Sequence, residues 1–166
     1  MELIIGYNTY ITSEECDKIL SDYYGPNSEI VAIYEGLDED AKEAYLYRSF
    51  LDMQRLLYRG FKKEKNQKAS FPRVNRFGKE SDEGMVKLAQ ALNSTVFVLE
   101  DNSDTNDTSI KNVLGYGRYG LKTYKLGSFS VSVDGSKYSN AIANTSKSGL
   151  VEEVLSEWLK GGCPIV

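Results

Sequence analysis

Hydrophobic and polar positions along the chain repeat mostly with the period of an α-helix. The segment TSEECDKILSDYYG begins with Thr12 and has Glu15 three positions later, which is the pattern of a capping box. The pair Gly25-Pro26 predicts where that helix ends. The next segment, SEIVAIYEGL, fits either a second short helix or an extended linker, and its pattern does not decide between them.

The longest helical pattern runs from about residue 38 to residue 59. Two of its faces are apolar, one formed by Leu46, Phe50, Met53 and Leu57 and the other by Ala44, Tyr47, Leu51 and Tyr58. A helix that is apolar over most of its girth is central in its fold or shared with a partner, and we expect a core helix. The remaining polar stripe consists of Arg48, Asp52, Arg55 and Arg59. We expect this stripe to be a solvated or intersubunit edge of salt bridges.

Two further elements follow. Ser81 is the expected cap of a helix whose apolar side carries Met85, Leu88, Ala89, Leu92 and Val96. The segment EDNSDTNDTS, which starts at residue 100, is rich in turn formers and predicts an exposed loop. Phe129, Val131 and Val133 then alternate with serines, the period of a half-buried strand, and Tyr124 and Leu126 are expected on its partner strand.

The last pattern, residues 150–160, is amphipathic. Its apolar face carries Leu150, Val151, Val154, Leu155 and Trp158. A polar segment, SKYSNAIANTSKSG, precedes it and is expected to be an extended linker. Such a helix can fold back on its own core or dock on a partner, and the pattern leaves both open. It is a candidate partner-docking helix.

Together these patterns predict a mainly α protein. We expect a small helical bundle with a short antiparallel β-hairpin and a C-terminal amphipathic helix on an extended linker. The predicted division is a helical core domain over 1–99, an exposed loop and hairpin over 100–135, and a linker with a docking helix and tail over 136–166.

The amino-acid composition limits which kinds of active site and metal site we expect. The 166 residues contain no His and two Cys, which form no CxxC pair. The chain therefore lacks the commonest general base and transition-metal ligand, and a thiolate zinc site is not expected. We see no nucleophile–base pair, and GYGRYG lacks the GxGxxG order of a dinucleotide site. We expect no enzyme, cofactor or metal. No apolar run is long enough to span a membrane and no signal peptide is apparent, so we expect an intracellular protein with no membrane partner.

Charge is distributed in blocks. Residues 1–57 carry four basic and twelve acidic side chains, whereas residues 58–79 carry eight basic and one acidic. A basic run with aromatic residues is typical of single-strand nucleic-acid binding. However, Phe71 precedes Pro72, which favours an extended chain and an anchor to the protein's own core. Blocks of opposite charge favour packing of copies side by side.

Several segments together resemble a family. NTYITSEECDKIL, DEDAKEAYLYRSFLDM, GFKKEKNQKASFPR and SDEGMVKLAQAL are similar, in this order, to segments of the head–tail connector (adaptor or head-completion) proteins of tailed bacteriophages. Some relatives of these are labelled DnaT-like single-stranded DNA-binding proteins. The family's loop pattern is matched by Gly60, Gln67, Ala69, Phe71, Pro72 and Arg73. Phe71 stands where the family usually has Trp, Ala69 replaces the usual Leu, and VNRFGKE replaces a short hairpin.

The resemblance implies a structural virion protein made in the host cytoplasm and located at the head–tail interface. It would form a ring of twelve copies beneath the portal protein, with a stopper or tail-completion protein on the other side and genomic DNA passing through its channel. In this reading the loop anchored by Phe71 and Pro72 presents cations to an acidic neighbour. The candidate interface residues are Lys62, Lys63, Lys65, Lys68, Arg73, Arg48 and Arg55. The alternatives are a single-stranded DNA-binding protein that uses residues 58–76 and, with no site to support it, a small enzyme.

Overall fold

The computed structural model describes residues 2–102, 123–126, 129–132 and 149–160. The protein is mainly helical and contains a short antiparallel β-hairpin, as the sequence predicted. The helices are α1 (Ser13–Tyr24), α2 (Glu29–Glu35), α3 (Glu39–Gln54), α4 (Glu83–Asn102) and α6 (Leu150–Val154), and a 3₁₀ turn, η3 (Ser156–Trp158), follows α6. The described helices are not long and apolar enough to cross a bilayer.

The helix starts follow local capping chemistry. The capping box of α1 forms, because the Thr12 side chain accepts from the N–H of Glu15 and the Glu15 carboxylate accepts from the N–H of Thr12. Asp38 caps α3 by accepting from the N–H of Ala41 at 2.7 Å. The cap predicted for α4 was wrong. Asp82 accepts from the N–H of Met85 at 3.0 Å, while the Ser81 hydroxyl accepts from the N–H of Arg73 at 2.9 Å.

Several boundaries also differ from expectation. SEIVAIYEGL forms a helix, α2, which settles the alternative that the sequence left open. Helix α3 ends at Gln54, earlier than predicted, and α4 continues through residues 100–102, where a loop was expected. The remainder of that predicted loop, the GYGRYG segment and the polar linker lie outside the described residues.

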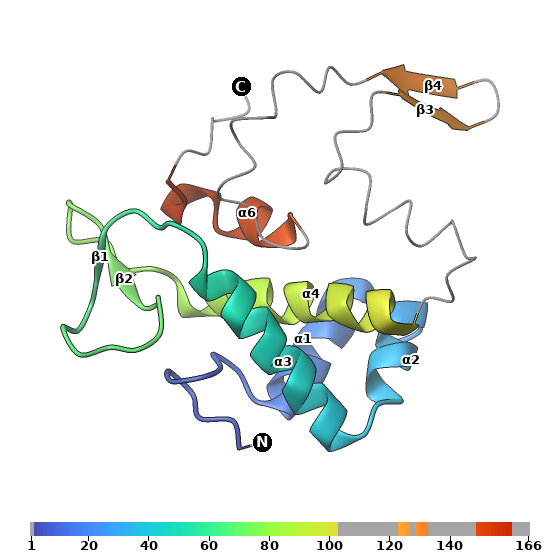
Figure 1. Cartoon of the computed structure of the whole chain (residues 1–166), viewed down its shortest axis with the longest axis horizontal. Helices are drawn as coiled ribbons and strands as arrows, with labels where there is room; N and C mark the ends of the chain where they lie inside the picture. The colour runs from blue at the N-terminus through green and yellow to red at the C-terminus, as the bar shows by residue number, and fades with distance from the viewer. Residues whose placement is uncertain (1, 103–122, 127–128, 133–148, 161–166) are drawn as a thin grey trace.

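Helix α4 lies at the centre of the bundle. It packs against α1, α2, α3 and α6, and Figure 1 shows α3 crossing it with α6 on the other side from the N-terminal segment. Its side chains from Val86 to Leu99 are buried except for two that are half-buried, Lys87 and Leu88. Polar members of this run therefore need partners. Gln90 accepts from the N–H of Tyr10 at 2.7 Å and donates to Leu46 O at 2.9 Å, which ties α4 to α3 and the N-terminal segment.

Two antiparallel hairpins complete the described structure. Strands β3 (Thr123–Leu126) and β4 (Phe129–Ser132) pair as predicted, with Tyr124 opposite Val131 and Leu126 opposite Phe129. Val133, predicted on the same strand, lies outside the described residues. The other pair, β1 (Phe61–Lys62) and β2 (Arg73–Val74), lies in the basic segment between α3 and α4 and was not predicted.

The C-terminal helix packs within the chain. Val151, Leu155 and Trp158 are buried in one apolar cluster with Phe50 of α3 and Phe71. Leu150 and Val154 pack against the second cluster, around Ile11, Leu20 and Leu92. The apolar face of the candidate partner-docking helix is therefore covered by the protein's own core. Packing on this core buries apolar surface in the same way as docking on a partner would.

Candidate functional site

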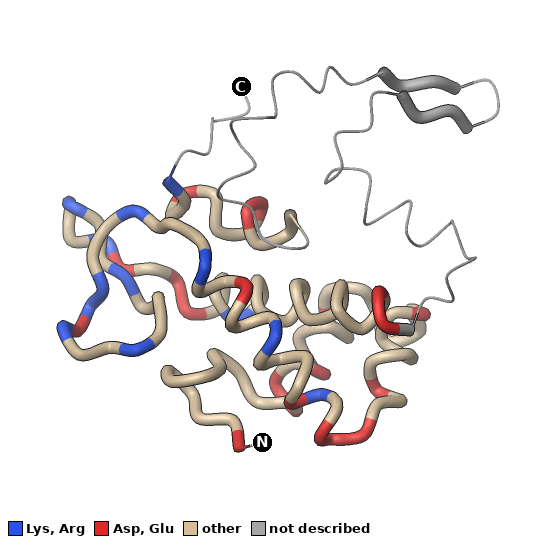
Figure 2. Tube along the Cα trace, in the orientation of Figure 1, with Lys and Arg blue, Asp and Glu red and all other residues tan. Residues whose placement is uncertain are grey.

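The basic loop, residues 58–80, connects α3 to α4 and is the most cationic part of the described chain. Figure 2 shows Lys and Arg concentrated on it, whereas Asp and Glu lie along α2 and the start of α3. The loop is therefore the place where each predicted interface residue must be located and its partners identified.

An aromatic cluster anchors the basic loop. Phe71 is buried, and its ring lies 4.6 Å from that of Tyr58, 6.2 Å from that of Tyr10 and 6.4 Å from that of Trp158, with edge-to-face geometry. The peptide bond to Pro72 is cis. Burial raises the pKa of Tyr10 to about 12, so this hydroxyl stays protonated at neutral pH. Phe71 thus anchors the loop to the core, and its buried ring is not available to stack on a base.

Arg73 braces the loop from inside. Its guanidinium donates to Gly60 O at 2.7 Å, Arg59 O at 2.8 Å and Ser70 O at 3.2 Å, and lies 5.8 Å from the Tyr58 ring centroid. Partial burial lowers the pKa of Arg73. All these contacts lie within the chain, so Arg73 stabilises the loop itself, and its role as an interface residue stays a prediction. Its side chain closes the loop.

The loop can close in this way only with a glycine at position 60. Its φ of +71° is the left-handed region, and a Cβ there would lie 2.4 Å from Val74 O. Gln67 donates to Ala69 O at 2.9 Å and to Pro72 O at 3.0 Å, and Ala69 is buried. The residues that match the family's loop pattern therefore each shape the loop, and none of them forms a chemical site.

The four predicted lysines divide into two pairs. Lys62 donates to Gln67 O and Lys68 O, each at 3.0 Å, and Lys63 forms an ion pair with Glu80 at 2.8 Å. That hydrogen bond raises the pKa of Lys63. Lys65 and Lys68 are exposed, and within the described residues their ammonium groups form no ion pair. Of these four lysines, Lys65 and Lys68 are the two whose ammonium groups have neither an ion pair nor a hydrogen bond in the part of the chain that the structure describes.

The polar stripe of α3 also differs from expectation. Asp52 is 7 % exposed and accepts from Asn93 at 3.2 Å, so it belongs to the α3–α4 contact and not to a solvated edge. Arg55 pairs with that Asp52 carboxylate, and Arg48 pairs with Asp101 and covers the Phe97 ring at 4.8 Å. Both arginines therefore have partners within the chain.

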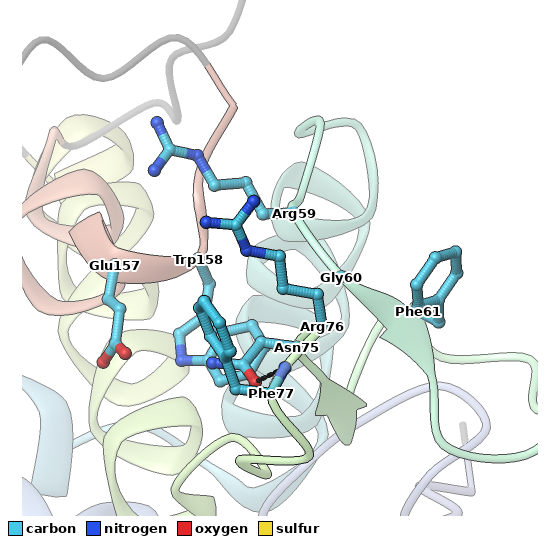
Figure 3. Close-up of a pocket in the computed structure, with 8 residues that line it drawn as sticks. All are labelled: Arg59, Gly60, Phe61, Asn75, Arg76, Phe77, Glu157 and Trp158. Carbon is cyan, nitrogen blue, oxygen red and sulfur yellow. Dashed lines mark hydrogen bonds between the residues drawn. The ribbon is translucent and has the colours of Figure 1, made fainter.

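A pocket of about 530 Å³ opens beside the basic loop. It is lined by Arg59, Gly60, Phe61, Asn75, Arg76, Phe77, Glu157 and Trp158, and we call it the loop pocket. In Figure 3 Arg59 and Arg76 extend in the same direction, whereas Phe61 is turned away from them. Phe61 is 73 % exposed and Phe77 is 78 % exposed. Solvent-exposed Phe beside Arg is unusual for a solvated loop and typical of a binding surface.

The sequence did not predict the loop pocket, because its walls come from separate segments. Backbone hydrogen bonds bring two of these segments together, because Arg59 N–H donates to Trp158 O at 2.6 Å and Lys160 N–H donates to Leu57 O at 2.9 Å. The sequence held one sign of this exposed surface. In VNRFGKE, Arg76 and Phe77 stand directly before Gly78, and a glycine there predicts a turn at the surface. Gly78 has the left-handed φ of +82° that such a turn uses.

Within the described residues, no group of three or more His, Cys, Asp or Glu side chains could hold a metal ion. Cys16 is buried, and burial raises the pKa of its thiol to about 11, which leaves it protonated and unreactive at neutral pH.

Comparison with known proteins returned no matching family model, no matching curated protein and no matching solved structure.

Proposed function

We propose that this chain is a structural virion protein, a ring-forming adaptor at the neck of a tailed bacteriophage. It joins the portal protein to the stopper or tail-completion protein, and the genome passes through its ring of twelve copies. The proposal rests on four segments similar to that family in their order, and on one observation in the structure. That observation is a rigid loop that is closed by its own side chains and directs cationic and aromatic groups outward.

The closure of the basic loop supports an assembly role. Residues that could bind a small molecule, such as Arg73 and Gln67, are occupied by loop carbonyls, whereas Lys65, Lys68, Phe61 and Phe77 face solvent. Preorganised loops lose little entropy on association, and Arg with aromatic residues dominates the energetics of protein interfaces. The acidic surface along α2 and the start of α3 offers a complementary charge on a neighbouring copy.

The direct test is to locate the protein in particles. We would tag it, produce it with its whole gene cluster, and label the tag on purified particles in electron micrographs. We expect label at a single vertex between head and tail. Protein that remains wholly in the soluble fraction, with particles unlabelled, contradicts the proposal.

A matched pair of variants tests the loop's part in assembly. Lys65→Glu/Lys68→Glu reverses the two unpaired lysines of the basic loop and should reduce incorporation. Lys18→Glu, on the exposed side of α1, changes charge away from the loop and should incorporate normally. Equal incorporation of both variants would show that the loop's charge does not drive assembly.

Single-stranded DNA binding is the second candidate, favoured by Phe61 and Phe77 beside Arg59 and Arg76. Base–aromatic stacking contributes about 1–3 kcal/mol per base. This function predicts that affinity for an oligonucleotide falls steeply with salt and that Phe77→Ala weakens binding. An adaptor ring held partly by apolar contacts should persist as the salt concentration rises.

A further inference from the structure

An exposed apolar turn lies near the N-terminus. Residues 2–9, which we call the N-terminal turn, carry Ile4, Ile5 and Tyr7, each more than half exposed, next to the exposed Glu2. Large apolar side chains that gather in solvent, as these three do within four residues, are typical of an interaction surface. Because Glu2 is negatively charged, a surface that binds this turn should carry positive charge beside its apolar part.

The N-terminal turn is preformed. Gly6 adopts a φ of +79° and donates to Thr9 O at 2.8 Å, and the Asn8 side chain accepts from the N–H of Ile4 at 2.6 Å and donates to Glu2 O at 3.0 Å. Its far end is fixed to the core, because the buried Gln90 donates to Thr9 Oγ1 at 3.0 Å. A turn ordered in this way loses little conformational entropy when it binds.

The loop pocket has the complementary chemistry. Phe77 and Trp158 offer apolar surface, and Arg59 and Arg76 offer positive charge at the same opening (Figure 3). Glu157 at its edge is already paired with Lys79 at 2.7 Å. The pocket therefore fits an apolar side chain that has a carboxylate beside it.

The N-terminal turn and the C-terminal wall of the loop pocket lie apart. Figure 1 shows the N-terminal segment on one side of α3 and α4, and α6, which leads into Trp158, on the other side. We therefore take a contact between the turn and the pocket to join different molecules. Because the surfaces differ, the contact is heterologous, and such contacts close into rings or extend into filaments.

We infer that the N-terminal turn of one copy inserts Ile5 and Tyr7 into the loop pocket of the next copy, with Glu2 facing Arg59 and Arg76. This inference rests on the proposed function, since it specifies the contact between neighbouring subunits of the ring. It assigns the role of interface anchors to Phe77 and Arg76, where the sequence pointed to lysines.

Sedimentation velocity on the full chain tests both surfaces. Ile5→Ser and Phe77→Ser should each raise the concentration at which association begins by about tenfold or more, as for interface anchors. Met85→Ser removes another exposed apolar side chain outside both surfaces and should leave association unchanged. Thermal unfolding of each variant checks that it is folded. Association of Ile5→Ser and Phe77→Ser equal to that of the unchanged chain overturns the inference.

Cross-linking tests the pairing itself. In a Cys163→Ser background, Tyr7→Cys and Glu157→Cys place thiols on the turn and at the pocket edge, while Cys16 is buried. With a short bis-maleimide, a mixture of the two single variants should give linked dimers and nothing larger. The double variant should give a ladder of several copies. Absence of these products both in solution and in purified particles overturns the inference.

The outcomes separate this inference from the proposed function. Rings at the particle vertex without a turn–pocket cross-link refute the inference and leave the adaptor intact. Loss of association in Asp40→Lys but not in Ile5→Ser assigns the contact to the acidic start of α3, and the inference fails. Phe77→Ser that weakens binding to an oligonucleotide without changing self-association assigns the pocket to nucleic acid, and the inference fails again.

Discussion

The hydroxyl of Tyr10 accepts a hydrogen bond from the backbone N–H of Phe71 at 3.2 Å, and thereby ties the basic loop to the N-terminal segment. The same hydroxyl accepts from Gln54 Nε2 at 2.7 Å, and Gln54 Oε1 accepts from Ser70 at 2.7 Å. The loop is thus positioned by a buried polar chain as well as by aromatic packing. A network of this kind is stable only while every member has a partner.

Removal of that hydroxyl should be costly. Tyr10→Phe keeps the ring and leaves the Phe71 N–H and the Gln54 amide without their buried acceptor, which should lower the free energy of unfolding by about 1–3 kcal/mol. Urea unfolding followed by circular dichroism measures it. Tyr23→Phe, at an exposed tyrosine, is the matched control and should change nothing. Equal stability of the two variants would show that the Tyr10 hydrogen bonds are not maintained in solution.

Two glycines of the basic loop with similar backbone angles should respond differently to alanine. At Gly60 the added Cβ meets Val74 O at 2.4 Å, whereas at Gly78, with φ +82°, nothing lies within 4 Å. Gly78→Ala should cost only the left-handed strain, about 1–2 kcal/mol, and Gly60→Ala clearly more. Thermal unfolding of the pair gives the comparison. A cost at Gly60 no greater than at Gly78 would mean that β1 and β2 do not approach as described.

Stability should decline in alkali through Cys16. Its thiol pKa is raised from 9.0 to about 11 by burial, so between these values the unfolded chain loses the proton while the folded chain keeps it. Below pH 9 this thiol makes its full contribution to the free energy of unfolding. As the pH rises from 9 toward 11, the contribution decreases by about 1.4 kcal/mol per pH unit.

Urea titrations from pH 8 to pH 11 measure this decline. Cys16→Ala should shift its onset upward to pH 10, where Tyr10, with its pKa raised from 10.0 to about 12, begins to contribute in the same direction. An unchanged onset in Cys16→Ala would show that the thiol is not buried in the folded protein.

The C-terminal segment should contribute to the stability of the isolated chain. Trp158→Ala removes a buried side chain that packs near Phe71, and should cost about 3–5 kcal/mol in the free energy of unfolding. Glu153→Ala, on the exposed side of α6, should have little effect. If both variants are as stable as the unchanged chain, the helix docks on a partner instead of its own core.

The parts of this protein that the sequence determined by itself are those set by neighbouring residues. The capping box at Thr12 and Glu15 and the pairing of β3 with β4 depend on side chains a few positions apart, and both formed as predicted. The burial of Phe71 was also readable, because a Phe before Pro in a rigid loop is commonly an anchor. The mainly helical class follows from the same short-range patterns.

Tertiary structure alone decided which polar and charged groups are used inside the chain. Asp52 and Arg73 read as surface residues from their spacing, but Asn93 and the loop carbonyls, far away in sequence, supply their partners. The loop pocket arises in the same way, because Arg59, Phe77 and Trp158 meet only when the C-terminal helix folds back. A periodic pattern gives the direction of a side chain relative to its own helix or strand, and only packing of distant segments determines what that side chain meets.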